Sequence, residues 1–228
     1  MARRGLFGTA NRLIGAVFGV VLVACGLFAA KLGYDSVQPP VSTLMAGRWL
    51  TGQPVERLWT PLKGFAPRLI DAVVMSEDGQ FCFHDGVDWK ELQDVIDDPD
   101  GPSRGASTIT MQVARNLYLW NGRSVIRKGL EIPLALLLDA VWTKKRILEV
   151  YLNIAEWGDG LFGAAAAARH DFSKGPGQLT AREAALLATA LPNPFLRNPA
   201  KPSRGQRELV AINLARQEGA GEWVRCVR

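Results

Sequence analysis

The chain has 228 residues, of which 48% are hydrophobic and 21% charged. This composition is typical of a globular protein and excludes disordered, collagen-like and disulfide-rich classes. The net charge is +5, but Arg3, Arg4 and Arg12 all precede the first acidic residue, Asp35. The rest of the chain is only mildly basic, which argues against a dedicated nucleic acid binder.

Residues 13–30 contain no charged residue, amide or proline. As a helix this run spans about 27 Å, close to the thickness of a bilayer core, about 30 Å. The sequence therefore predicts a transmembrane helix over 13–33. The positive-inside rule places the tail, residues 1–12, in the cytoplasm. The remainder then lies in the periplasm, anchored by a single pass in the inner (cytoplasmic) membrane.

Two alternatives to an anchor stay open. A cleaved signal peptide is one, although the run is longer than a usual signal core and no clean cleavage site follows it. A buried core helix is the other.

The part after the anchor is expected to be mostly helical. The prolines within 36–42 predict an extended linker, so residues 34–50 are a linker and the start of a membrane-proximal lobe, and 51–228 form the main domain. Apolar periodicity and capping residues predict helices over 67–77, 88–96, 107–116, 124–142, 143–153, from the Thr180–Glu183 capping box onward, and over 203–217. The glycine- and proline-rich stretch 97–105 is expected to be a mobile loop. No run of alternating strands is visible.

The cysteines and histidines show no metal-ligand spacing. They are Cys25, Cys82, Cys226, His84 and His170. A structural zinc site is therefore not expected. Whether Cys82 and Cys226 pair cannot be read from the sequence, because the distance between their Cα atoms is unknown at this stage.

Four segments are polar where a helical protein would prefer apolar packing: 77–88, 104–116, 123–131 and 144–153. Each has an ordinary explanation when taken alone. Arg127, Lys128 and Glu131 would form exposed ion pairs within one helical turn, worth a few tenths of a kcal/mol. His84 alone would be a structural residue, and Ser107 and Thr108 would be helix caps.

Together, these segments resemble the monofunctional biosynthetic peptidoglycan glycosyltransferases of glycosyltransferase family 51, which share the transglycosylase domain of penicillin-binding proteins. The first motif, E-D-x-x-F-x-x-H-x-G, is matched at Glu77, Asp78, Phe81, His84 and Gly86. The second, G-x-S-T-x-x-Q-Q, is matched at Gly105, Ser107, Thr108 and Gln112, and the third, R-K-x-x-E, at Arg127, Lys128 and Glu131. The fourth and fifth resemble 146–158 and 163–174. The resemblance covers residues 36 to 200, approximately.

The chain departs from the family pattern at four positions. Met111 replaces the first of two glutamines, Arg115 a common lysine, and Asp171 an aromatic residue. Pro133 follows Glu131 inside a predicted helix, where it removes a backbone donor and predicts a kink.

The resemblance implies a mainly α, lysozyme-like domain with a membrane-associated second lobe over 51–228. It also implies the polymerisation of lipid II by inverting β-1,4 glycosyl transfer, with release of polyprenyl diphosphate. This chemistry needs a base for the attacking hydroxyl and cations for the departing diphosphate. The family pattern makes Glu77 the base and Glu131 the second essential glutamate. The implied substrate-binding residues are Ser107, Thr108, Gln112, Arg115, Asn116, Arg123, Arg127 and Lys128.

No cofactor is implied as required; divalent Mg or Mn is optional and would act through the substrate diphosphate. The expected partners are lipid II, the growing glycan strand, the membrane and proteins of wall synthesis and division, with no nucleic acid. A lytic transglycosylase or muramidase is one alternative, although a hydrolase has no diphosphate to bind. A non-catalytic wall scaffold is another. We expect no penicillin-binding transpeptidase domain, because its motifs do not follow residue 200.

Overall fold

The computed structural model describes residues 2–98, 105–120, 122 and 124–228, with side chains from residue 14 onward. The chain forms two compact units, Met1–Pro39 and Pro40–Arg228. Most of the expected loop, residues 99–104, lies outside the described residues, as does Arg123.

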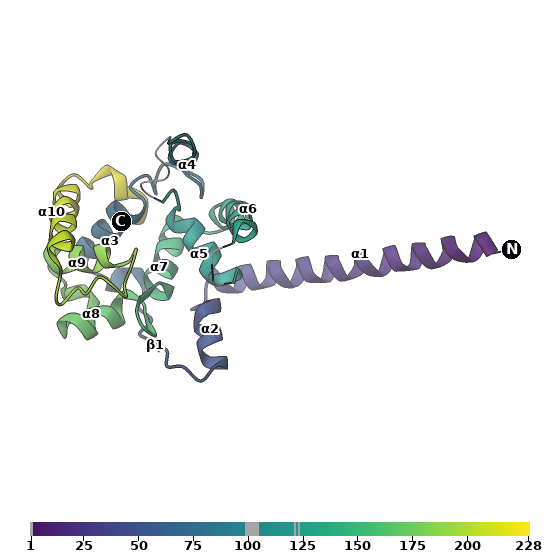
Figure 1. Ribbon diagram of the computed structural model, residues 1–228, viewed down its shortest axis with the longest axis horizontal. Helices are drawn as coiled ribbons and strands as arrows, with labels where there is room; N and C mark the ends of the chain where they lie inside the picture. Colours follow the sequence, from purple (N-terminus) through teal and green to yellow (C-terminus); the bar gives the residue numbers. More distant parts are fainter. Residues whose placement is uncertain (1, 99–104, 121, 123) are drawn as a thin grey trace. The chain divides into compact units, whose positions relative to one another are not determined.

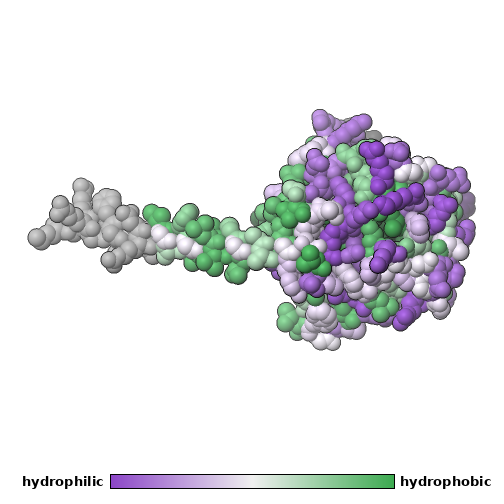
Figure 2. Space-filling view, turned by 180° about the vertical axis from the view of Figure 1, so that it is seen from behind, coloured by the Kyte–Doolittle hydropathy of each residue, from purple (hydrophilic) through white to green (hydrophobic). Residues whose placement is uncertain are grey.

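The first unit consists of one long helix, α1 (Ala2–Asp35). Its stretch Ile14–Asp35 is long and apolar enough to cross a membrane, and none of its most apolar window is buried. Figure 2 shows the mostly hydrophobic surface of this part of α1. The core-helix alternative is therefore wrong for this segment. A signal sequence meets the same criteria and stays the alternative to an anchor.

The second unit is mainly α (Figure 1). Its helices are α2 (Thr43–Leu50), α3 (Pro67–Glu77), α4 (Trp89–Ile96), α5 (Ile109–Tyr118), α6 (Val125–Val141), α7 (Lys144–Ile154), α8 (Ala164–Phe172), α9 (Ala181–Ala190) and α10 (Arg204–Glu218), with the short 3-10 helices η1 (Leu62–Gly64), η2 (Pro176–Gln178) and η3 (Glu222–Val227). The capping box of Thr180 and Glu183 is confirmed, and Thr143 caps α7 as predicted. Ser203, where the last helix was expected to begin, is the cap of α10. The cap of α5 is Thr108 and not Ser107.

Two groups of helices make up the core. Helix α3 packs on α9 and α10, and α5 packs on α6 and α7. In Figure 1, α3 and α7 lie between the group α8–α10 and the group α4–α6. Leu69, Val73, Ile147 and Leu148 are fully buried there, and burying each such side chain contributes about 1.5–3 kcal/mol. Helices α3 and α7 both contribute buried side chains to this core and therefore give the site between them a rigid base.

A small sheet corrects the strand-free expectation. Strands β1 (Glu56–Arg57), β2 (Glu156–Gly158) and β3 (Leu161–Phe162) form a sheet of order β1-β3-β2. The pair β1–β3 is parallel, and β2–β3 is antiparallel. Strands of two or three residues are too short to show alternation in a sequence. Helices α2 and α8 were not predicted either.

Helix α6 continues through Pro133 without interruption. Gly129, whose carbonyl would have accepted the missing proline N–H, is exposed, so water can satisfy that carbonyl. Proline therefore does not displace Glu131 from the helix.

Candidate active site

Glu77 is the last residue of α3 and lies against α5 and α7. Its Oε2 atom accepts a hydrogen bond from Nε2 of Gln112 (3.0 Å) and faces the Tyr151 hydroxyl at 3.4 Å. That hydroxyl also lies 3.2 Å from Oε1 of Gln112, so its proton is shared between the amide and the carboxylate. Oε1 of Glu77 is buried and has no hydrogen-bond partner among the described residues. Oε2 is thus held by Gln112 and Tyr151, whereas Oε1 is able to accept a further hydrogen bond.

Burial raises the pKa of the Glu77 carboxyl above its ordinary value. The hydrogen bonds from Gln112 and Tyr151 oppose this shift, Asp78 adds to it, and the Arg115 cation opposes it. Burial likewise raises the pKa of Tyr151 well above its ordinary value, so Tyr151 stays a neutral donor. A carboxylate whose affinity for a proton is raised in this way suits general base catalysis.

Asp78, the next residue, ties the loop after α3 to the start of α5. Its Oδ1 lies 3.0 Å from Nε2 of His84, and its Oδ2 accepts a hydrogen bond from the Ile109 backbone N–H (2.9 Å). A carboxylate is favoured at a helix N-terminus by the unpaired N–H groups and the dipole. The first motif therefore positions Glu77 through its neighbour.

Gly86 closes the same loop against α6. Its φ is +89°, and a Cβ there would lie 2.6 Å from the Ala135 carbonyl oxygen. The Thr108 hydroxyl donates to the Gly86 carbonyl (2.6 Å) and accepts from the Met111 N–H (3.1 Å). Both roles of this hydroxyl are used within the fold, which makes Thr108 a buried support and not an exposed substrate contact.

A second cluster surrounds Glu131 on α6. The Glu131 side chain is fully buried and forms ion pairs with Arg127 and with Lys128, the latter at 3.2 Å. Lys128 also donates to the Ser107 hydroxyl (2.5 Å), and Arg127 Nε donates to the Gly122 carbonyl (2.8 Å). The Lys128 side chain is 42% exposed. In this cluster, the partly exposed Lys128 cation is therefore held in place by the buried Glu131 carboxylate.

The polar residues of 144–153 have a structural role, with one exception. Glu149 accepts from the Leu62 N–H (2.8 Å), and Asn153 bonds both the N–H and the carbonyl of Thr60 (2.7 and 2.8 Å). These contacts hold the segment before α3 in place. Tyr151 is the exception, since it reaches Glu77. Tyr151 was not among the predicted site residues. The available signal was helical spacing: Tyr151 is two positions from Glu149 and from Asn153 and therefore lies on a different face of the helix from both.

A cavity of about 1180 Å³ opens near the N-terminal ends of α3 and α7 and is lined by residues such as Arg68, Asp71 and Arg146. Neither Glu77 nor Tyr151 lines it. The cavity is therefore separate from the surroundings of Glu77 and Glu131, although Leu62 and Glu149 line it.

Comparison with known proteins identifies the family of this chain. The chain matches the transglycosylase family over residues 45–217. It is 58% identical over 191 residues to the biosynthetic peptidoglycan transglycosylase of Brucella suis biovar 1 (strain 1330), covering 83% of this chain and 85% of that protein. The chain belongs to the transglycosylase family.

Two further relatives extend the match. The biosynthetic peptidoglycan transglycosylase of Rhodopseudomonas palustris (strain HaA2) is 51% identical over 217 residues, covering 93% of this chain and 95% of that protein. That of Rhizobium leguminosarum bv. trifolii (strain WSM2304) is 44% identical over 234 aligned positions, covering 99% of this chain and 98% of that protein. The mainly α fold, the family and the enzyme class expected from the sequence, a peptidoglycan glycosyltransferase, are confirmed.

Within this transglycosylase, six of the ten predicted site residues, Glu77 and Glu131 included, belong to the two clusters. Gln112 joins Glu77, whereas Ser107, Arg127 and Lys128 join Glu131. The Asn116 carbonyl accepts from Thr43 on α2, and Arg123 lies outside the described residues. At the departure from the second motif, Met111 is fully buried in an apolar cluster with Val87 and Ala135. Methionine at this position therefore adds core packing in place of a polar group.

Proposed function

We propose that this transglycosylase polymerises lipid II into glycan strands with Glu77 as the general base. This proposal is supported by the Glu77 carboxylate, in which Gln112 and Tyr151 contact one oxygen while the other has no hydrogen-bond partner among the described residues. An incoming 4-hydroxyl would donate to that free oxygen. As the hydroxyl oxygen bonds the anomeric carbon of the donor strand, its proton passes to Glu77 and the bond to the polyprenyl diphosphate breaks, with inversion.

We assign the departing diphosphate to the cations Arg115 and Lys128. Arg115 lies on the same α5 face as Gln112 and is close enough to lower the pKa of Glu77. Lys128 is partly exposed and is positioned by Ser107 and Glu131. Cations at a leaving group stabilise the charge that develops in the transition state. Asn116 and Arg123 complete the proposed set, following the family pattern.

Divalent metal is proposed as an optional aid bound by the substrate diphosphate. Among the described residues, no group of three His, Cys, Asp or Glu side chains could hold an ion. No step of the proposed reaction is assigned to a metal.

The location of the enzyme is proposed from α1 and the disulfide. The arginines at the start of the chain favour a cytoplasmic N-terminus, and the Cys82–Cys226 disulfide favours an oxidising compartment for the catalytic unit. A shared membrane raises the effective concentration of lipid-linked substrate around an anchored enzyme. Proteins of wall synthesis and division are proposed as further partners.

The hydrolytic and scaffold alternatives are less well supported. A hydrolase has no diphosphate to bind, so it would not need the cation Arg115 near Glu77 or the cation Lys128 beside Glu131. A scaffold would not need the raised proton affinity of Glu77. Purified full-length protein incubated with labelled lipid II should form a polymer that lysozyme digests. Moenomycin, a phosphoglycolipid that mimics the family's donor, should block this. Fragmentation of preformed glycan without polymer formation would instead support the hydrolase.

A further inference from the structure

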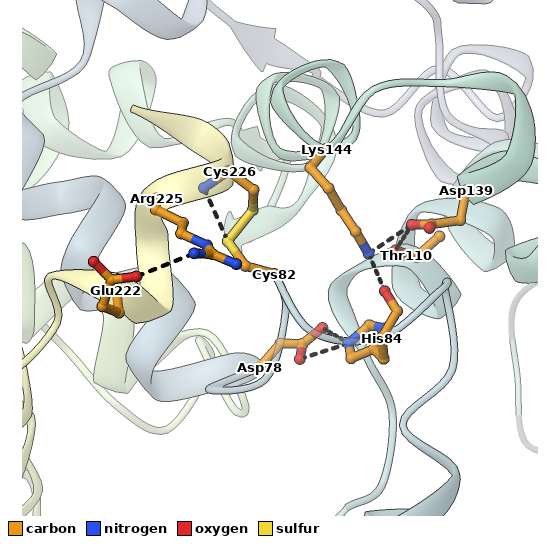
Figure 3. The surroundings of a disulfide bond; sticks show 9 residues. All are labelled: Asp78, Cys82, His84, Thr110, Asp139, Lys144, Glu222, Arg225 and Cys226. Atoms are coloured by element: carbon orange, nitrogen blue, oxygen red, sulfur yellow. Dashed lines mark hydrogen bonds and ion pairs between the residues drawn. A yellow bond between two sulfur atoms is a disulfide. The ribbon is translucent and has the colours of Figure 1, made fainter.

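A short segment at the end of the chain, η3 together with Arg228, is fastened to both sides of Glu77. We call this segment the clasp. Its first attachment is the disulfide between Cys82 and Cys226, whose Cα atoms are 5.5 Å apart. Figure 3 shows that this bond joins the loop after α3 to η3. Cys82 lies inside the first motif, between Phe81 and His84.

The clasp also covers the loop with its aromatic and basic side chains. The ring of Trp223 meets the ring of Phe83 edge-on at 5.1 Å, and the Arg225 guanidinium lies 5.7 Å from the centre of the Phe83 ring. Val224 and Val227 are buried. The clasp is therefore packed on the protein and not merely tethered to it.

The second attachment is on α3 itself. Arg228 donates through one nitrogen to both carboxylate oxygens of Asp71, each at 2.8 Å, and the Asp71 side chain is 2% exposed. Asp71 precedes Glu77 by about 9 Å along the helix axis. The clasp is thus attached to α3 at Asp71, which precedes Glu77, and to the loop at Cys82, which follows Glu77.

Without the clasp, the loop would depend on non-covalent contacts alone. The His84 carbonyl accepts from Lys144 (2.6 Å), which also pairs with Asp139 (2.7 Å), and Asp78 bonds His84 (Figure 3). The loop has no regular helix to fix its path between Asp78 and α4. The disulfide, between cysteines 144 residues apart in the sequence, adds a covalent restraint to this loop.

We propose that the clasp positions the Glu77 carboxylate for proton transfer, so that Cys82, Cys226 and Arg228 are positioning residues of the enzyme. This inference rests on the proposed role of Glu77 as base. A loosened clasp lets α3 and the loop shift, and water then reaches the carboxylate. Small displacements of a catalytic group cost large factors in rate, up to about 100-fold for about 1 Å.

A positioning role has a signature that a purely stabilising role lacks. The charged and titratable groups facing Glu77 are Asp78 on the loop, Arg115 on α5 and Tyr151 on α7. Hydration of Glu77 would lower its raised pKa toward the ordinary value. The acidic limb of the kcat–pH profile should then move to lower pH while kcat falls about tenfold and KM changes less.

The experiment compares Cys82→Ser/Cys226→Ser, Arg228→Ala and wild type as full chains with labelled lipid II, well below their unfolding temperatures. Arg228→Lys should restore part of the rate. Cys25→Ser, in the apolar helix, and Arg204→Ala, which removes an exposed ion pair, are the controls that should match wild type. Where the double serine variant does not fold, dithiothreitol applied to folded Cys25→Ser protein opens the disulfide to two thiols and is itself oxidised to a cyclic disulfide.

A fall in melting temperature with unchanged kcat and an unmoved acidic limb would overturn the proposal, because the clasp would then only stabilise the fold. Glu77→Gln in the same assay separates the two hypotheses. Near-wild-type turnover in that variant removes the base assignment, whatever the clasp variants do.

Discussion

The two glutamates of the candidate site, Glu77 and Glu131, have different hydrogen-bond and ion-pair partners. Glu77 is surrounded by the neutral donors Gln112 and Tyr151, and one of its oxygens lacks a partner in the described structure. Glu131 is fully buried between two cations, Arg127 and Lys128. Burial raises the pKa of the Glu77 carboxyl, which suits proton transfer, whereas the Glu131 carboxylate forms ion pairs with two basic side chains and holds them in place. Glutamate is therefore suited to proton transfer at position 77 and to holding the Lys128 cation in place at position 131.

The largest effect should come from Glu77→Gln. Glutamine keeps the size and the hydrogen bonding of the side chain but cannot accept a proton, so turnover should fall by about 10²–10⁴-fold. Folding, followed by circular dichroism, and moenomycin binding should remain close to wild type. Equal losses of binding and turnover would mean that Glu77 assembles the site, as Glu131 does.

Glu131→Gln should act mainly on stability and binding. Removing the charge leaves Arg127 and Lys128 facing a neutral group, and breaking a buried pair costs about 3–5 kcal/mol, less here because Lys128 is partly exposed. A lower melting temperature and weaker moenomycin binding are both expected. Glu208→Gln, which removes an exposed pair with Arg204, is the matched control and should change neither quantity.

Arg115→Ala should lower kcat by removing a charge-assisted contact worth about 1.5–3 kcal/mol, roughly tenfold to 200-fold in rate. Because Arg115 lowers the pKa of Glu77, its loss should also move the acidic limb of the kcat–pH profile to higher pH. Arg115→Lys should keep most of the activity. A full loss in Arg115→Lys would indicate that the guanidinium shape is needed and not only its charge.

The smallest effect concerns pH and Tyr151. The pKa of Glu77 is raised by burial, so the base is protonated, and the enzyme inactive, at a higher pH than for an ordinary glutamate. Tyr151→Phe removes a hydrogen bond that favours the carboxylate and should move the acidic limb further upward. An unmoved limb in this variant would mean that the Tyr151 proton is given mainly to Gln112.

The stability of the wild-type protein should also depend on pH, because burial raises the pKa of the Glu77 carboxyl. A folded-state pKa above the unfolded value means that folding takes up a proton. The cost of burying the charged form is present above the raised pKa and disappears as the pH falls toward the unfolded value. Glu77→Gln should therefore stabilise the fold at neutral pH, and this gain should fade at acidic pH in thermal melts.

The sequence by itself determined most of the helical segments, though not α2 and α8, and it determined the family. Caps such as Thr143 and Ser203, and the apolar run of α1, act within a turn or two of helix, so their signals are local and readable. The first motif likewise identified Glu77 and Gly86 because it lies within one short stretch of chain. The mobile loop over 97–105 and the domain boundaries remain predictions.

Only the tertiary structure decided which distant residues meet. The disulfide of Cys82 with Cys226, the ion pair of Arg228 with Asp71, and the contact of Tyr151 with Glu77 each join segments far apart in the chain. The sheet of β1 and β3 is of the same kind. Such pairs depend on how α3, α5, α7 and η3 pack, because a side chain's partner across the core is set by the summed fit of many contacts and leaves no periodic signal in either segment.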